Sequence, residues 1–189
     1  KVVEPHLEQL AAEYDRDELI IVHLVPWLLY SIPEATERYN WYNYGSGTPT
    51  MMFNGLNNAL TGSQSYNTIK SRITAQLNAT PTISLKANRT SSGADSVISG
   101  TVENISSSAL TNLVINGMIF KNRGDYPYSV IDIFEENKIT IASLAAGEKY
   151  NFTMTLNGIN WDGQGADGVI FVQSVNDPQK RIRQSLFIN

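Results

Sequence analysis

Few side chains in this sequence could carry out acid–base or nucleophilic chemistry. The two imidazoles are His6 and His23, and neither is spaced from a Ser or an Asp in the way a catalytic triad would suggest. The sequence contains no cysteine, which excludes a disulfide framework, a thiolate metal site and thiol catalysis within these residues. We therefore predict no catalytic residue here and expect structural roles for both histidines.

A glycine-rich segment, residues 160–168, offers several oxygen ligands close together. Its candidate donors are Asp162, Gln164 and Asp167. The segment lacks the terminal Glu and the fixed Gly of an EF-hand loop. The two interpretations are a turn whose acids cap backbone groups, which we favour, and a calcium site. We predict no metal and no cofactor.

A second candidate lies at Thr48-Pro49, within the segment 45–55. Thr50 and an apolar run follow it, and the run ends at Asn54-Gly55, a strong turn signal. A proline is tolerated at the first residue of a strand, where its missing N–H costs little. An X-Pro bond also adopts the cis form at a cost of only about 0.5–1 kcal/mol. We predict a strand that opens at a cis Thr48–Pro49 bond.

Composition excludes several partners. The net charge of −4 and the pI near 5.2 provide no basic face for nucleic acid. The longest apolar stretch, residues 19–30, is interrupted by His23 and Pro26 and is shorter than the roughly 20 residues of a membrane span. We expect neither a nucleic-acid partner nor a transmembrane segment. The nearby aromatics Trp41, Tyr42 and Tyr44 could form a binding rim, but we expect them to cover the core.

The elements expected to position these residues differ between the two halves of the chain. In the first half, apolar spacing predicts helices over 2–14 and 65–77. A doubly buried strand is predicted over 19–25, and a short strand at 59–61 should pair back on the strand after Pro49. The spacing from Ser31 to Glu34 indicates a capping box that opens a helix through Tyr39.

The second half is predicted to be all-β. Tyr150, Phe152, Met154 and Leu156 alternate with polar residues, the pattern of a strand with one face in the core. Eight such short strands with regular turns indicate an immunoglobulin-like sandwich. The strands are expected over 83–87, 97–103, 113–120, 128–134, 138–143, 149–156, 169–175 and 181–188.

Two stretches resemble the thioredoxin fold. Residues 1–14 are similar to the thioredoxin helix that follows its Cys-x-x-Cys motif, and Thr48-Pro49 is similar to the cis-proline site of that family. The resemblance implies an α/β thioredoxin-like domain over 1–79, incomplete at its N-terminus, before an all-β immunoglobulin-like domain over 82–189. It also implies a substrate-binding role, in which the backbone of Thr48 pairs with a bound peptide and the ring of Pro49 forms a wall.

The second half also resembles sandwich modules of bacterial envelope proteins. The pattern Gly-x-Val-x-Asn occurs at 100–104, and Leu-x-Pro-Gly-Glu occurs at 144–148 with Ala146 in place of the proline. A thioredoxin-like unit followed by a sandwich is similar to Omp28-related outer-membrane proteins. This resemblance implies an extracytoplasmic location, which could be periplasmic, outer-membrane-associated or secreted.

Two hypotheses on function follow. In the first, the protein is an extracytoplasmic thiol–disulfide oxidoreductase whose cysteine motif lies before Lys1, so that residues 1–189 alone are inactive. In the second, it is a non-enzymatic envelope protein that binds or adheres through both domains. Either hypothesis implies a protein or peptide partner.

The thioredoxin resemblance also implies a missing strand between residues 19–25 and the strand after Pro49. Without it, two apolar strands would expose their edges, and such edges recruit a partner strand. We expect a β-segment to fill this gap, from residues before Lys1 or from another copy in a strand-swapped homodimer. We expect residues 82–189 to fold alone.

Overall fold

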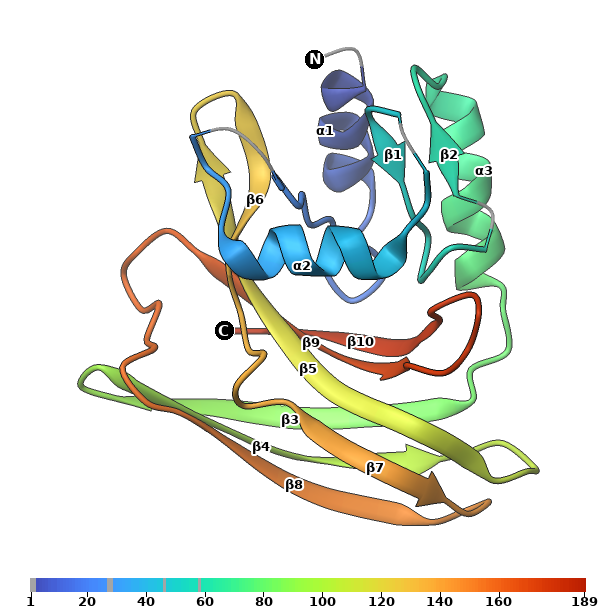
Figure 1. The fold of residues 1–189 in the computed structure, drawn as a ribbon, viewed down its shortest axis with the longest axis vertical. Coiled ribbons are helices and arrows are strands. Elements are labelled where there is room, and N and C mark those ends of the chain that lie inside the picture. Colours follow the sequence, from blue (N-terminus) through green and yellow to red (C-terminus); the bar gives the residue numbers. More distant parts are fainter. Residues whose placement is uncertain (1–2, 27–28, 46, 58) are drawn as a thin grey trace.

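Two stacked β-sheets form the larger part of the computed structural model, which describes residues 3–26, 29–45, 47–57 and 59–189 (Figure 1). These residues form three helices and ten strands, so strands dominate a mixed architecture. The elements are α1 (Glu4–Glu13), α2 (Pro33–Tyr42), β1 (Thr50–Met51), β2 (Leu60–Thr61), α3 (Tyr66–Leu77), β3 (Ile83–Ser92), β4 (Asp95–Asn104), β5 (Leu110–Arg123), β6 (Tyr126–Ile133), β7 (Ile139–Leu144), β8 (Lys149–Leu156), β9 (Asp167–Ser174) and β10 (Ile182–Ile188).

All eight strands expected in the second half of the chain are present. One sheet has the order β3-β4-β8, and the other has the order β10-β9-β5-β6, with β7 also paired to β5. Every pairing between these strands is antiparallel. Side chains from both inner faces meet in one apolar cluster, which includes Ile98, Phe152, Leu156 and Ile170. The alternation of β8 is confirmed, because its core-facing side chains are Phe152, Met154 and Leu156.

The five-stranded sheet is also covered on its outer face. Its outer side chains form a second apolar cluster: Met118, Phe120, Val130, Ile133, Val169 and Phe171. The apolar side chains of Ile20, Val22, Leu24 and Ile32 pack against this cluster. Figure 1 shows α2 crossing above this sheet, with α1, β1, β2 and α3 on the same side. The first half of the chain therefore forms a third layer.

Residues 19–25 do not form the strand that the sequence predicts. They are extended, and their single described β-bridge is a parallel one between His23 and Ser129 of β6. The His23 N–H donates to Tyr128 O at 2.8 Å, and the Val130 N–H donates to His23 O at 3.0 Å. An apolar segment needs cover on both faces and partners for its backbone groups. The edge of β6 and the outer face of the sheet supply these partners.

The helices of the first half agree with the sequence prediction with two corrections. Leu10 of α1 packs with Ile69 and Ile73 of α3 in a separate cluster, but Leu77, predicted to face inward, is 42% exposed. The Ser31–Glu34 capping box does not form, because the residue that caps α2 is Ile32 and no side chain caps this end. Pro33 at the first position sets where the helix begins.

The predicted pairing of the two short strands is confirmed. β1 and β2 are antiparallel, with Thr50 opposite Thr61. The connection between them docks onto the β9–β10 connection, where the Leu56 N–H donates to Gln179 O at 2.7 Å and the Ile182 N–H donates to Asn54 O at 2.9 Å. This contact joins the N-terminal layer to the sandwich.

The expected β-segment between residues 19–25 and β1 is not found among the described residues. There, β1 and β2 form a two-stranded sheet, and residues 19–25 pair with β6 instead. The strand-swapped homodimer remains a prediction, as does the division into domains over 1–79 and 82–189.

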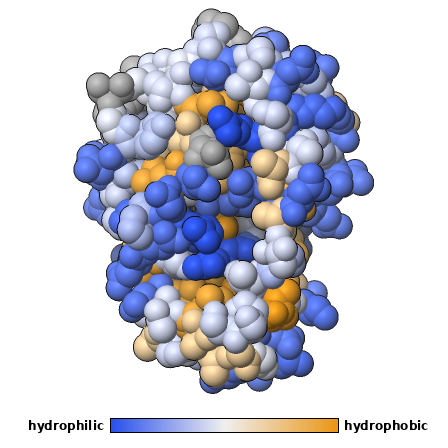
Figure 2. Space-filling view, turned by 90° about the vertical axis from the view of Figure 1, so that its right-hand side faces the viewer, coloured by the Kyte–Doolittle hydropathy of each residue, from blue (hydrophilic) through white to orange (hydrophobic). Residues whose placement is uncertain are grey.

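The surface carries no single continuous apolar band on the side shown in Figure 2. Hydrophobic residues form separate patches among hydrophilic ones, with a large patch toward the lower end, over the stacked sheets. Within the described part of the chain, no helix is both long and apolar enough to cross a membrane.

Candidate functional site

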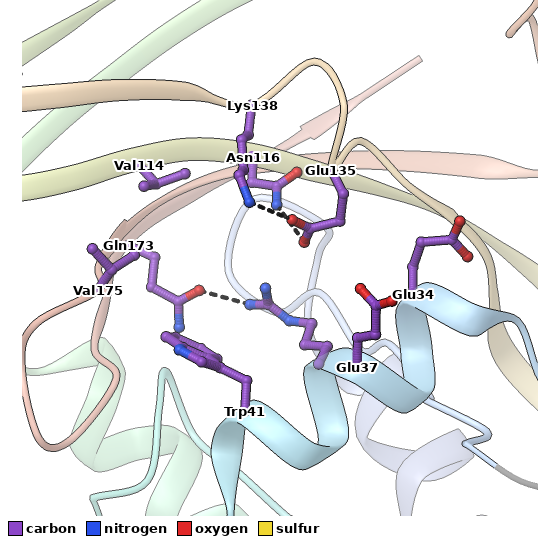
Figure 3. Close-up of a pocket in the computed structure, with 10 residues that line it drawn as sticks. Glu34, Glu37, Trp41, Val114, Asn116, Glu135, Lys138, Gln173 and Val175 are labelled. Atoms are coloured by element: carbon purple, nitrogen blue, oxygen red, sulfur yellow. Dashed lines mark hydrogen bonds and ion pairs between the residues drawn. The ribbon is translucent and has the colours of Figure 1, made fainter.

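A pocket of about 240 Å³ lies between α2 and the outer face of the five-stranded sheet. Figure 3 shows Glu34, Glu37 and Trp41 rising from α2 toward side chains of the sheet. The lining residues come from α2, β5, β9 and the β6–β7 connection: Glu34, Glu37, Arg38, Trp41, Val114, Asn116, Glu135, Lys138, Gln173 and Val175. The sandwich and the N-terminal layer therefore build the pocket together.

Arg38 is the central side chain of the pocket. It is only 7% exposed, and its Nη2 donates to Gln173 Oε1 at 2.7 Å and to Tyr42 Oη at 3.0 Å. The guanidinium carbon lies 4.9 Å from the centre of the Phe171 ring and 5.7 Å from that of Trp41. Arg38 Nε is buried without a hydrogen-bond partner among the described residues. The pocket therefore contains a cation held by neutral acceptors and aromatic rings.

Gln173 is fixed in position by further hydrogen bonds. Its side chain is almost fully buried, and its Nε2 donates to Lys180 O at 2.6 Å and to Tyr42 Oη at 3.3 Å. The Lys180 ammonium lies 4.4 Å from the centre of the Trp41 ring. These contacts leave Gln173 Oε1 facing Arg38, so the amide orientation follows from the network.

The opposite wall contains an ion pair between Lys138 and Glu135. The Asn116 Nδ2 donates to Glu135 Oε1 at 3.0 Å, and Lys138 Nζ lies 2.9 Å from Glu135 Oε2 (Figure 3). The Gly117 N–H donates to Asn116 Oδ1 at 2.7 Å, which fixes the amide. The side chains of Asn116 and Glu135 are therefore preorganised on the sheet side of the pocket.

The α2 side carries two carboxylates, Glu34 and Glu37. Neither Glu34 nor Glu37 forms an ion pair within the described residues. Burial raises the pKa of the neighbouring Asp132 above its usual range, and the negative charge of Glu34 raises that pKa further. Glu34 and Asp132 are therefore close enough for their negative charges to interact.

The sequence contained a signal for this site that our sequence analysis missed. Glu34, Glu37, Arg38 and Trp41 follow the i, i+3, i+4, i+7 spacing of one helix face. An apolar residue would be expected on such a face if it only packed on a sheet. Three charged side chains and one indole on a single helix face therefore indicate a polar site, which the prediction of a plain short helix overlooked.

Thr48 and Pro49 lie outside this pocket. Both are exposed, and the peptide bond between them is cis, as predicted. The Gly62 N–H donates to Pro49 O at 2.8 Å, and Thr50 Oγ1 donates to Gly47 O at 2.8 Å. The turn is therefore well fixed, with its Thr48 and Pro49 side chains at the surface.

The other predicted candidates are dispersed. The His6 ring lies 6.3 Å from the ring of Tyr66, and burial lowers the pKa of His23 below its usual range. The predicted aromatic cover holds for Tyr42, which is buried, whereas Tyr44 is 40% exposed. Sequence patterns could not show which of these side chains meet.

The segment 160–168 is held by protein partners. Asp162 Oδ1 lies 2.7 Å from Arg89 Nη1, and the Ser91 hydroxyl donates to the second carboxylate oxygen. The Ser91 hydrogen bond, followed by that from Arg89, holds the pKa of Asp162 below its usual range. Asp167 accepts from Arg16 Nη2 at 3.2 Å. Among the described residues, no group of His, Cys, Asp or Glu could hold a metal ion.

Taken together, the fold is a mixed one with a β-sandwich, and the site is a small polar pocket between its covered sheet and α2. Its described lining includes carboxylates, amides, an ammonium and a guanidinium, but no hydroxyl, imidazole or thiol nucleophile. No protein-family model matches the chain, and no curated protein matches its sequence.

The fold resembles that of HBP35 of Porphyromonas gingivalis, with a TM-score of 0.61 and 15% identity over 82% of this chain. The chain spans 57% of the length of that structure. Less extensive likenesses include a domain of the outer membrane lipoprotein Omp28 from the same organism, with 9% identity and a TM-score of 0.36 over 58% of this chain and 88% of that one. That TM-score is too low to establish a shared fold.

Proposed function

We propose that this chain is a non-enzymatic binding protein of a bacterial cell envelope. The preformed pocket beside α2 carries the proposal, because its polar side chains are fixed by hydrogen bonds before any ligand arrives. Its described lining contains no hydroxyl, imidazole or thiol side chain, and its ammonium, that of Lys138, is held in an ion pair with Glu135. Polar groups that converge in this way suit recognition of a small ligand.

We also propose Thr48 and Pro49 as a contact site for a peptide. The support is their exposure at the opening of β1 and the resemblance of this segment to the thioredoxin family. In that arrangement, an extended peptide would pair with the Thr48 backbone and pack against the Pro49 ring. The N-terminal layer would then be a redox-silent thioredoxin-like unit.

The envelope location rests on the sequence resemblance of 100–104 and 144–148 to bacterial envelope sandwich modules. The likeness to HBP35 supports the architecture alone. Fractionation of the producing cells tests the location: the protein is expected with the envelope or the medium. Recovery in the cytosolic fraction would contradict it.

A thiol–disulfide oxidoreductase is the second candidate, supported by the resemblance of residues 1–14 to the helix after a Cys-x-x-Cys motif. Its chemistry requires a thiolate, and residues 1–189 contain no cysteine. We therefore expect no turnover in an insulin-reduction assay with this chain. Reduction of insulin by the purified chain, free of contaminating thiols and faster than with the assay's electron donor alone, would sink the binding proposal.

Peptide binding provides the positive test. In a nuclear magnetic resonance titration with a library of extended peptides, amide signals around Thr48 and β1 are expected to shift. Pro49→Ala should weaken this binding, whereas Pro81→Ala, at an exposed position between α3 and β3, should leave it unchanged. Peptides that shift other surfaces equally well would remove the assignment of this site.

A further inference from the structure

Arg38, the buried cation of the pocket, has no negatively charged partner among the described residues. Arg38 is 7% exposed, and its described acceptors, Gln173 and Tyr42, are uncharged. Its Nε–H has no hydrogen-bond partner among the described residues. A buried charge without a counter-ion is unfavourable. An anionic acceptor placed beside Arg38 would relieve this deficit through charge-assisted hydrogen bonds.

The α2 side of the pocket has the opposite deficit. Glu37 is exposed and Glu34 is half-exposed, and neither forms an ion pair within the described residues. Figure 3 shows both side chains on the α2 side, across from Glu135 and Lys138. Lys138 pairs with Glu135, and no ion pair joins it to Glu34 or Glu37 within the described residues. A cationic group on a ligand would be attracted to them.

Size and apolar surface limit the ligand further. The volume of about 240 Å³ is below the roughly 300–1,000 Å³ of pockets that take drug-sized molecules. Val114, Val175 and the ring of Trp41 contribute apolar surface between the charged groups. The ligand must therefore be small, with a short apolar portion that separates or flanks two opposite charges.

We infer that this pocket binds a free amino acid, with its carboxylate toward Arg38 and its ammonium toward Glu34 and Glu37. The inference rests on the proposed binding function and adds the class of ligand. The Arg38 guanidinium suits a carboxylate because a hydrogen bond from a cation to an anion is stronger than one to the neutral acceptors it now has. A zwitterion also brings no net charge into a pocket that contains both signs.

Other small ligands satisfy only part of the pocket. A simple anion would meet the negative charges of Glu34 and Glu37. A simple cation would leave the Arg38 Nε–H without an acceptor and add a like charge to it. A neutral sugar could hydrogen-bond to every group but would offset none of the three unpaired charges.

Isothermal titration calorimetry with the standard free amino acids tests the inference. At least one should bind with a Kd of about 1 mM or tighter, a range open to a ligand of this size. Its N-acetyl derivative, which lacks the ammonium, and its primary amide, which lacks the carboxylate, should each bind at least about tenfold more weakly. Changing the ligand tests the Arg38 contact without a substitution that could unfold the protein.

The double variant Glu34→Gln, Glu37→Gln tests the ammonium contact. It should weaken amino-acid binding by about tenfold or more. The matched control is Glu8→Gln with Asp17→Asn, which removes two exposed carboxylates away from the pocket and should leave binding unchanged. Thermal melting of both variants checks that each is folded. The Trp41 indole N–H signal, assigned with Trp41→Phe, should shift on binding in the native protein.

Each other outcome overturns the inference. Equal binding of the amide would indicate a cation site, and equal binding of the N-acetyl derivative would indicate an anion site. Binding of glucose or N-acetylglucosamine without amino acids would indicate a sugar site. If no probe binds, the inference fails, yet peptide binding at Thr48 would preserve the proposed function. Insulin reduction would instead remove the proposed function while amino-acid binding stood.

Discussion

The two sheets of the sandwich share one core but have different surroundings. In the three-stranded sheet, β8 alternates between buried and exposed side chains from Asn151 to Leu156. In the five-stranded sheet, β9 is buried at every residue from Gly168 to Ser174, because the N-terminal layer covers the second face. One sheet has a wet face, and the other is an interior layer.

This difference explains where the pocket lies. Both sheets contain buried polar side chains, but those that line the pocket, Asn116 in β5 and Gln173 in β9, belong to the doubly covered strands. A polar side chain at these positions is stable only with hydrogen-bond partners, and Glu135 and Arg38 supply them. The exposed face of the other sheet instead carries Ser, Thr and Asn in contact with solvent, as in the pair Thr101 and Asn151.

Removing the N-terminal layer should have the largest effect, because it would expose the outer face of the five-stranded sheet to solvent as well. A chain of residues 82–189 would keep the core between the sheets but expose the outer apolar cluster around Phe120 and Phe171. Exposed apolar patches of this kind promote association. We expect β-rich circular dichroism with self-association in size-exclusion chromatography and binding of the dye ANS. A monomer that binds no ANS, unlike our expectation, would show that the layer is dispensable cover.

One substitution on the outer face of each sheet should show how differently the two faces contribute to stability. Phe171→Ala removes a ring from the covered outer face and should cost about 3–5 kcal/mol in the free energy of unfolding. Thr155→Ala, on the exposed face of β8, should change it by less than about 0.5 kcal/mol. Urea denaturation measures both. Similar small losses at the two positions would mean that the outer face is poorly packed.

A smaller loss of stability is expected where the β1–β2 connection of the N-terminal layer docks onto the β9–β10 connection. Gly55 has φ +125°, and an added Cβ would lie 2.6 Å from Gln179 O, so Gly55→Ala should cost about 1–3 kcal/mol. Gly62 also has positive φ, but nothing lies within 4 Å of an added Cβ. Gly62→Ala should therefore cost only the strain of the left-handed backbone, about 1–2 kcal/mol, and less than Gly55→Ala. Equal losses in urea denaturation would show that backbone conformation, not docking, sets the cost.

The smallest effects on stability should come from the ionisation of Asp162 and Asp132, and the two should depend on pH in opposite directions. Asp162, beside the open sheet, has a lowered pKa, so its stabilisation is complete above the unfolded pKa of about 4 and is lost as pH falls through the folded value. Asp132 on the covered sheet has a raised pKa, so its ionisation destabilises the fold as pH rises past about 4.

Melting temperatures of Asp162→Asn and Asp132→Asn across pH 2 to 7 test these signs. Relative to the native chain, Asp162→Asn should flatten the loss of stability at acid pH. Asp132→Asn should raise the melting temperature at pH 7 more than at pH 3. The same direction of change for both variants would contradict the difference in burial.

The sequence supplied most strands and the helices because their apolar periodicity reflects one buried face. The same reasoning predicted a strand over residues 19–25, where the structure has a single described bridge to β6, since a run of apolar residues shows that two faces are covered but not by which elements. The cis Thr48–Pro49 bond could be predicted because the signal for it lies in neighbouring residues. The pocket was not, because Arg38 and Gln173 are 135 residues apart and only the layering brings them together.

The long separation of the contacts that hold the N-terminal layer also bears on biosynthesis. His23 pairs with residues 128 and 130, and Asn54 accepts a hydrogen bond from Ile182. A ribosome releases the first half of the chain long before these partners emerge, and contacts of such long range close slowly. The apolar segment 19–25 therefore stays without its final cover until β6 and β10 have been synthesised.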